Sequence, residues 1–195
     1  MLGWIKGLTY KIENRASRAG LFYNIARRYY KDVIEKESIL ANITSSDHVL
    51  CIGGGMCPFS AILFHQLTGA RVTVIDNNSL CIPKAQDIIN RLGIDKYVQV
   101  LFQYGGSEDL DYSQYSVIHL ALQVSPMEQV FSQVEKQALS GTRFLMRRPT
   151  KHFDDMYCQM SCNTLTCGPY ITHKSRNIGS TLLYTKQVEL AEASA

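Results

Sequence analysis

Residues 49–60 read Val-Leu-Cys-Ile-Gly-Gly-Gly-Met-Cys-Pro-Phe-Ser, an apolar run followed by three glycines and a proline. The apolar run predicts a buried strand, and Pro58 suits the first turn of a helix, where its missing N–H has no partner to lose. A strand-to-helix turn of this kind adopts backbone angles that are costly for residues with side chains. Side chains there would also keep a ligand away from the backbone N–H groups. The stretch therefore predicts a strand-turn-helix unit that holds a nucleotide-like ligand.

A second apolar strand follows the glycines and ends in an acid. Residues 72–76 read Val-Thr-Val-Ile-Asp, and Asp76 lies about 20 residues past the glycines, where folds of this kind bind a ribose. In a dinucleotide fingerprint, Gly53 and Gly55 would fill the first two glycine positions, but Pro58 stands at the third. S-adenosylmethionine has no pyrophosphate, so that third glycine is not required. We therefore expect S-adenosylmethionine, with Asp76 accepting hydrogen bonds from both ribose hydroxyls. The alternative is a tight turn that binds no ligand.

The rest of the chain alternates strands and helices. Helices are expected to open near Pro58, Pro83 and Pro126, and the further strands are expected at Tyr97–Phe102, Tyr115–Ala121 and Thr142–Met146. This alternation predicts an α/β protein with a mostly parallel sheet and helices on both faces. Two late segments, Thr164–His173 and Ser180–Gln187, predict a C-terminal antiparallel hairpin. The combination is typical of the Rossmann-like class I methyltransferase fold.

We divide the chain into three parts. Residues 1–47 are expected to form an N-terminal helical appendage, residues 48–187 the S-adenosylmethionine-binding domain, and residues 188–195 a flexible tail. From about Leu21 to Leu40, apolar residues are spaced for one face of a helix. Such a helix must dock on another surface.

Composition limits the class of partner. The 195 residues are enough for one α/β domain with a full core. A net charge of +3 and a pI of about 8.5 are too mild to indicate nucleic acid or an anionic membrane. The start of the chain lacks the apolar core of a secretory signal, and no apolar run reaches the length of a membrane span. We expect a cytoplasmic protein that acts on a small molecule, with a homodimer as an open alternative.

The glycine loop also resembles one branch of this fold. Residues 52–60, Ile-Gly-Gly-Gly-Met-Cys-Pro-Phe-Ser, are similar to the I-G-[SG]-G-P-x-P-x-[ST] loop of nicotianamine synthases and their archaeal and bacterial relatives. Pro58 and Ser60 occupy matching positions, whereas Met56 replaces the first loop proline, and the likeness extends loosely over residues 20–186. The resemblance implies transfer of the 3-amino-3-carboxypropyl arm of S-adenosylmethionine in place of its methyl group, with methylthioadenosine as by-product. It also implies that tyrosines and acids from before the first strand line the active site.

The candidate site residues follow from these loops and from the carboxyl end of the fourth strand. We expect the cofactor to be bound by Gly53, Gly54, Gly55, Met56, Pro58, Asp76, Asn77, Gln103, Tyr104 and Leu120. The candidate catalytic residues are Tyr30, His119 and Gln123. His119 is either a base near neutral pH or a core histidine, and Gln123 is expected to orient the substrate. The helix before the first strand offers Tyr29, Tyr30, Glu35 and Glu37, for which simple packing is the alternative.

Four further features concern charged side chains, thiols and possible metal ligands. Arg147 and Arg148 are either a solvated basic turn or a clamp for a substrate carboxylate. The thiol of Cys57, at the start of a helix, is either acidified or packed in the loop. The six cysteines are expected to be free thiols in the absence of a secretory signal. We predict no metal site; the alternative is a cluster of Cys158, Cys162 and Cys167 with His152 or His173 as a fourth ligand.

The sequence thus predicts an S-adenosylmethionine-dependent transferase. Methyl transfer to a small-molecule nucleophile is the reaction expected from the fold. Aminocarboxypropyl transfer is the alternative that the loop resemblance implies. A third possibility is a non-catalytic module that binds an adenosyl compound and docks on a partner through the helix at 21–40; the acid at position 76 counts against it.

Overall fold

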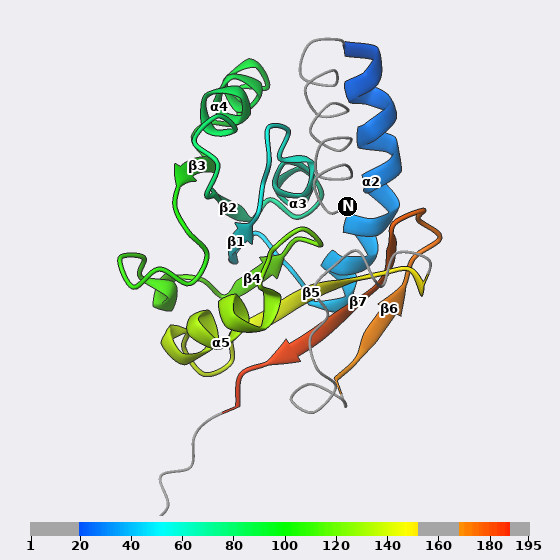
Figure 1. The fold of residues 1–195 in the computed structure, drawn as a ribbon. Coiled ribbons are helices and arrows are strands. Elements are labelled where there is room, and N and C mark those ends of the chain that lie inside the picture. Colours follow the sequence, from blue (N-terminus) through cyan, green and yellow to red (C-terminus); the bar gives the residue numbers. More distant parts are fainter. Residues whose placement is uncertain (1–19, 152–167, 188–195) are drawn as a thin grey trace, which may run out of the picture.

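A seven-stranded sheet forms the centre of the protein (Figure 1). The computed structural model describes residues 20–151 and 168–187. The strands are β1 (His48–Ile52), β2 (Arg71–Asp76), β3 (Val98–Phe102), β4 (Val117–Leu120), β5 (Arg143–Pro149), β6 (Tyr170–Thr172) and β7 (Ile178–Thr185). The helices are α2 (Gly20–Leu40), α3 (Phe59–Thr68), α4 (Ile82–Arg91) and α5 (Met127–Gln137), with a 3₁₀ turn η1 (Tyr112–Gln114).

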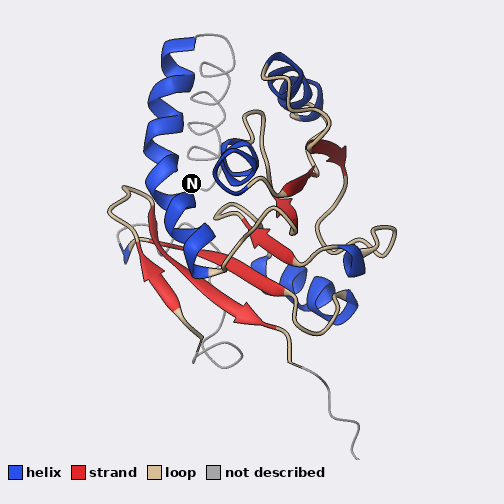
Figure 2. Ribbon diagram, turned by 180° about the vertical axis from the view of Figure 1, so that it is seen from behind, coloured by secondary structure: helices blue, strands red, loops and turns tan. Residues whose placement is uncertain are grey.

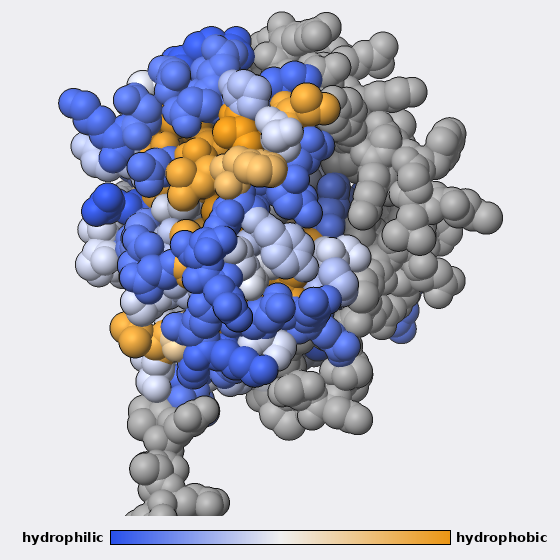
Figure 3. Space-filling model, turned by 60° about the vertical axis from the view of Figure 1, so that its left-hand side comes forward, coloured by the Kyte–Doolittle hydropathy of each residue, from blue (hydrophilic) through white to orange (hydrophobic). Residues whose placement is uncertain are grey.

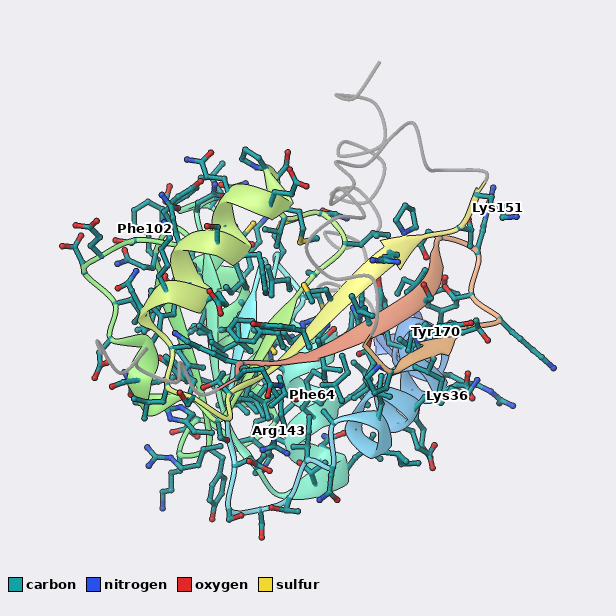
Figure 4. All side chains as sticks on the ribbon, turned by 90° about the horizontal axis from the view of Figure 1, so that it is seen from below. Lys36, Phe64, Phe102, Arg143, Lys151 and Tyr170 are labelled. Atoms are coloured by element: carbon teal, nitrogen blue, oxygen red, sulfur yellow. The ribbon has the colours of Figure 1, made fainter. Side chains whose placement is uncertain are left out.

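The strand order is β3-β2-β1-β4-β5-β7-β6. Strands β1 to β5 are parallel, whereas β7 is antiparallel to both β5 and β6. Phe102 on β3 and Tyr170 on β6 mark the two opposite edges of the sheet (Figure 4). This topology confirms the expected Rossmann-like class I methyltransferase fold with its C-terminal antiparallel pair. The strand order reverses between β1 and β4, and such a reversal leaves a crevice at the carboxyl ends of the strands.

Helices cover both faces of the sheet (Figure 2). On one face, α2, α3 and α4 enclose a core that includes Ile34, Ile62 and Ile89. On the other face, α5 and η1 pack through Phe131 and Tyr112 against Phe144 and its neighbours. Successive strand residues therefore alternate between two apolar layers, as expected for a sheet that is buried on both sides.

The N-terminal helix α2 docks on the sheet and on α3, as its apolar face predicts. Val33 and Ile34 are buried, and Tyr30 stacks on Phe59 of α3 with ring centroids 5.6 Å apart. At the end of α2, the Arg143 guanidinium of β5 donates hydrogen bonds to the carbonyls of residues 41 and 42 and pairs with the Asp47 carboxylate. Apolar packing thus holds the helix itself against the protein core, and Arg143 holds the turn after the helix against β5.

Strand β5 is longer at its carboxyl end than the sequence indicates. The expected strand stops at Met146, but the observed strand continues to Pro149 because β7 pairs with it as far as Ile178. The sequence Arg-Arg-Pro at 147–149 has the composition of a turn, and only the antiparallel partner keeps it extended. Arg147 is consequently a strand residue. Strand β4 is shorter than expected, since η1 and an extended link precede it.

The surface around α4 and β3 is mainly hydrophilic, with apolar side chains gathered in one area (Figure 3). The larger exposed apolar residues of this region include Leu80, Leu92 and Phe102. Phe102 is exposed because β3 is an edge strand. Within residues 20–151 and 168–187, no helix combines the length and apolar character that a membrane crossing requires.

We expect Ile34→Ala to lower the free energy of unfolding by about 2–5 kcal/mol, because the change empties a fully buried position between α2 and the sheet. Ile39→Ala on the same helix is the matched control. Ile39 is 73 % exposed, and its loss should cost no more than about 0.5 kcal/mol. Urea denaturation measures both values. Equal effects of the two changes would show that α2 is not docked through Ile34.

Candidate functional site

A cavity of about 330 Å³ lies along the carboxyl ends of the parallel strands. This volume is at the lower end of the range for small-ligand sites, about 300–1,000 Å³. One end is formed by the glycine loop after β1 and by the loops after β2 and β3. The other end is formed by the residues after β4, by β5, by α2 and by the turn before β7. The cavity therefore occupies the crevice that the strand order creates.

The glycine loop approaches the cavity with its backbone exposed. Gly53 and Gly55 have φ angles of 84° and 64°, a region that favours glycine. Gly54 has a different requirement, since a Cβ atom there would lie 2.1 Å from Cγ1 of Val74 on β2. The loop is held to β2 because the N–H groups of Gly53 and Gly54 both donate to the Ile75 carbonyl. Pro58 stands directly before α3, and its carbonyl accepts the first helical hydrogen bond, from Ile62.

Asp76, at the end of β2, lines the cavity and organises the loops beside it. One carboxylate oxygen accepts a hydrogen bond of 2.7 Å from the N–H of Gly55, and the other accepts one of 2.9 Å from the N–H of Asn78. A carboxylate has about four lone-pair positions, so acceptor capacity remains on both oxygens. Asn77 also lines the cavity. This arrangement suits a ligand that offers hydroxyl groups.

The loop after β3 forms the adjoining wall. Gln103 and Tyr104 line the cavity, and the Tyr104 side chain is 39 % exposed. The following glycine, Gly105, is also required by packing, since a Cβ atom there would lie 2.6 Å from a side-chain carbon of Ile52. The sequence predictions did not include Gly105. It brings this loop against β1 and so places Tyr104 and Gln103 beside the glycine loop.

The candidate catalytic residues Tyr30, His119 and Gln123 all line the opposite end. Tyr30 comes from α2, and its ring lies 5.8 Å from the guanidinium carbon of Arg147. Gln123 is exposed at the rim, after β4. Tyr29, which precedes Tyr30 on α2, points instead toward the turn before β7, where its hydroxyl forms hydrogen bonds with Ser175 and Asn177.

A buried polar cluster lies behind this end of the cavity. The Glu37 carboxylate accepts two hydrogen bonds of 2.8 Å from the Arg147 guanidinium and one of 2.6 Å from the Thr181 hydroxyl. Glu37 is fully buried and Arg147 is 5 % exposed. Burial acts to raise the pKa of Glu37, but the charge and hydrogen bonds of Arg147 outweigh it and hold that pKa well below its usual range. Arg147 is therefore not a solvated turn residue, since its charge is paired with a helix residue inside the protein.

His119 belongs to the same cluster and is not the base near neutral pH that its sequence position suggested. Burial and the nearby Arg147 charge lower the pKa of His119 to about 3, although Glu37, 3.7 Å away, acts in the opposite direction. The ring is thus neutral near pH 7. It is not a satisfied core histidine either, because neither ring nitrogen has a hydrogen-bond partner among the described residues.

Two expected cofactor contacts lie outside the cavity wall. Met56 and Leu120 are fully buried, and neither lines the cavity. Glu35 is exposed and also lies away from it. Conversely, the sequence predictions missed the backbone turn at Asn177 and Ile178, which closes the cavity beside Tyr30.

Cys51, Cys57 and Cys81 are buried, and all three residues line the cavity. The cysteines at 158, 162 and 167 lie outside the described residues. In the part of the chain that the structure describes, no group of three or more His, Cys, Asp or Glu side chains is placed to hold a metal.

Comparison with known proteins shows the fold. No protein-family model and no curated protein sequence matches the chain. A glutamate-to-glutamine variant of MtNAS, a nicotianamine synthase, in complex with S-adenosylmethionine superposes with a TM-score of 0.77 and 20 % identity, covering 94 % of this chain and 76 % of that one. MtNAS in complex with MTA and tNA gives a TM-score of 0.74 at 21 % identity, covering 92 % and 70 %.

An RNA methyltransferase from Salinibacter ruber in complex with S-adenosyl-L-homocysteine gives a TM-score of 0.64 at 16 % identity, covering 83 % of this chain and 94 % of that one. These likenesses establish the class I S-adenosylmethionine-dependent methyltransferase fold. They also confirm, for the fold, the resemblance to nicotianamine synthase that the glycine loop indicated.

We expect the protein to lose stability as the pH falls from 7 toward 5. Unfolded His119 takes up a proton near its ordinary pKa of 6.5, whereas the folded ring does so only near 3, so acid favours the unfolded chain. At pH 5 this linkage amounts to at most about 2 kcal/mol, since each pKa unit corresponds to about 1.4 kcal/mol.

The measurement is the free energy of unfolding in urea as a function of pH, for the natural protein and for His119→Leu. The variant should show a shallower pH dependence between about pH 5 and 6.5, by about one proton, and the same dependence as the natural protein at higher pH. Parallel curves over the whole range would mean that His119 is protonated in the folded state.

Proposed function

We propose that this chain, which has the class I methyltransferase fold, binds S-adenosylmethionine in the cavity and transfers one of its groups to a small-molecule nucleophile. The observation that carries the proposal is the joint position of the bare glycine backbone and the Asp76 carboxylate at one end of a single cavity. The strand-order reversal where this cavity lies is the general ligand position of such sheets. The composition, with a net charge of +3, supports a small-molecule acceptor.

The described residues fit the cofactor. Asp76 would accept hydrogen bonds from the ribose hydroxyls with the acceptor capacity that Gly55 and Asn78 leave, and Asn77 lies beside it. Tyr104 and Gln103 would hold the adenine, the first by its ring face and the second by its amide. Gly53 and Gly54 leave the backbone open to the methionine arm. When bound, the cofactor supplies an electrophilic carbon attached to a sulfonium.

The protein's own contribution is to position the acceptor and to exclude water. Displacement at carbon depends mainly on alignment of the two reactants and needs only weak proton removal. Tyr30 and Ile178 close the end of the cavity opposite Asp76, and Gln123 lies at its rim with an amide that can donate and accept. His119, neutral near pH 7, is a hydrogen-bonding group and a weak base.

Methyl transfer is the reaction expected from the fold, and aminocarboxypropyl transfer is the second candidate. A specific observation favours the second: the MtNAS structures superpose over 92–94 % of this chain, with higher TM-scores than the RNA methyltransferase. The loop at 52–60 supports the same candidate through Pro58 and Ser60.

The leaving nucleoside distinguishes these reactions. Purified protein is incubated with S-adenosylmethionine and a panel of amines, thiols and amino acids, and the nucleoside products are separated. S-adenosylhomocysteine indicates methyl transfer, and methylthioadenosine indicates transfer of the arm. Product formed only when RNA is added would contradict the small-molecule acceptor, and tight binding without any product would support the non-catalytic module.

We expect Asp76→Ala to weaken binding of S-adenosylhomocysteine at least about tenfold, corresponding to about 1.4 kcal/mol, because both ribose contacts and the support of the Gly55 N–H are lost. Asp87→Ala is the matched control, since its carboxylate is exposed on α4 in an ion pair with Arg91. Isothermal titration calorimetry measures both affinities. An affinity of Asp76→Ala within about twofold of the natural protein would remove Asp76 from the ribose site.

A further inference from the structure

Arg147 lines the cavity, and Glu37 pairs with only one edge of its guanidinium. Glu37 binds Nε and Nη2 of the guanidinium, each at 2.8 Å. The third nitrogen, Nη1, forms no hydrogen bond with any residue that the structure describes. Arg147 is 5 % exposed and lines the cavity, so Nη1 is the guanidinium nitrogen that remains for a ligand bound there.

The pattern of the Glu37 contact fixes which edge of the guanidinium is available. A guanidinium has five N–H donors in one plane, and Glu37 uses the pair on the Nε side. The other edge, with Nη1 and the outer hydrogen of Nη2, presents two parallel donors. A carboxylate matches this geometry with its two oxygens.

His119 supplies a second, independent sign of a ligand at this place. Its ring is 1 % exposed, lines the cavity, and has no hydrogen-bond partner at either nitrogen among the described residues. A buried polar group without a partner is costly, and a ligand that bonded to it would remove that cost. His119 on β4 and Arg147 on the adjacent β5 project from the same face of the sheet, toward Glu37.

We propose that Arg147, oriented by Glu37, binds a carboxylate at the β4–β5 end of the cavity, with His119 as an additional hydrogen-bonding partner. The proposal rests on the proposed function, because it assigns the end of the cavity that the adenosine would leave free. Two sources of the carboxylate share this chemistry: the amino-acid arm of the cofactor, and the acceptor substrate. Glu37 is then a positioning residue, and Arg147 a binding residue.

The first experiment compares two nucleosides that differ in this group. S-adenosylhomocysteine carries the carboxylate and methylthioadenosine lacks it. Their affinities are measured by calorimetry for the natural protein and for Arg147→Lys, which keeps a positive charge beside Glu37 but loses the paired donors. If the arm is the source, Arg147→Lys weakens S-adenosylhomocysteine binding at least tenfold and changes methylthioadenosine binding less than twofold.

Two further variants complete this comparison. Glu37→Gln should show the same selective loss, because a merely structural defect would weaken both nucleosides alike. Arg148→Lys is the matched control: Arg148 is the next residue of β5 and is exposed, so neither affinity should change. Thermal unfolding of each variant establishes that it is folded at the temperature of the titration.

The second experiment tests the acceptor as the source. Protein saturated with methylthioadenosine is titrated with 4-aminobutyrate and succinate, and with butylamine and succinamide as counterparts without a carboxylate. If the acceptor is the source, the natural protein binds the carboxylates in preference to their counterparts, Arg147→Lys loses this preference, and S-adenosylhomocysteine binding stays unchanged.

The two experiments distinguish failure of the carboxylate site from failure of S-adenosylmethionine binding as a whole. If the natural protein binds neither nucleoside, the proposed function is wrong, and the carboxylate site falls with it. If it binds both, and Arg147→Lys changes neither the nucleoside affinities nor the response to the carboxylates, the carboxylate site is wrong while the proposed function stands.

Discussion

The arrangement of the cavity depends on one buried ion pair, between Glu37 of α2 and Arg147 of β5. Removing two charges from water is expensive, and the pair is tolerated because the carboxylate receives three hydrogen bonds, including one from Thr181 of β7. Those three bonds come from two neighbouring strands, so they define where the C-terminal end of α2 lies over the sheet. If α2 moved away, Arg147 would be left in the interior without its charged partner. The Tyr30 wall of the cavity is therefore held by the same pair that orients Arg147.

The parts of the fold and site that the sequence predicted are those with local signals. The unit β1-loop-α3 depends on an apolar run, three glycines and a proline within twelve consecutive residues, and Asp76 depends on its place at the end of the next strand. The same local logic located α2, whose buried residues Val33 and Ile34 lie on the expected face. Such features are decided by backbone sterics and periodicity, which neighbouring residues alone determine.

The other end of the site depends on contacts between distant segments, and there the sequence was ambiguous. Glu37 and Arg147 are 110 residues apart, and Arg147 reads as part of a basic turn until β7 extends the strand around it. One signal was present in α2: Glu37 follows Val33 by four residues and Ile34 by three, so an acid sits on the apolar face of the helix. An ionisable residue at such a position requires a buried partner. The protonation of His119 could not be predicted, because it depends on that partner and on burial.

Gly54 has a consequence for how this loop can vary among proteins. Its restriction does not come from the backbone angle but from Val74 on the neighbouring strand, whose methyl carbon occupies the space of a Cβ atom. A side chain at position 54 thus demands a smaller residue at position 74. The two positions share one volume, and substitution at either is conditional on the other. A distant relative could therefore carry serine or alanine at position 54 if a residue smaller than valine stood at position 74. A search that required glycine at position 54 would miss such a relative.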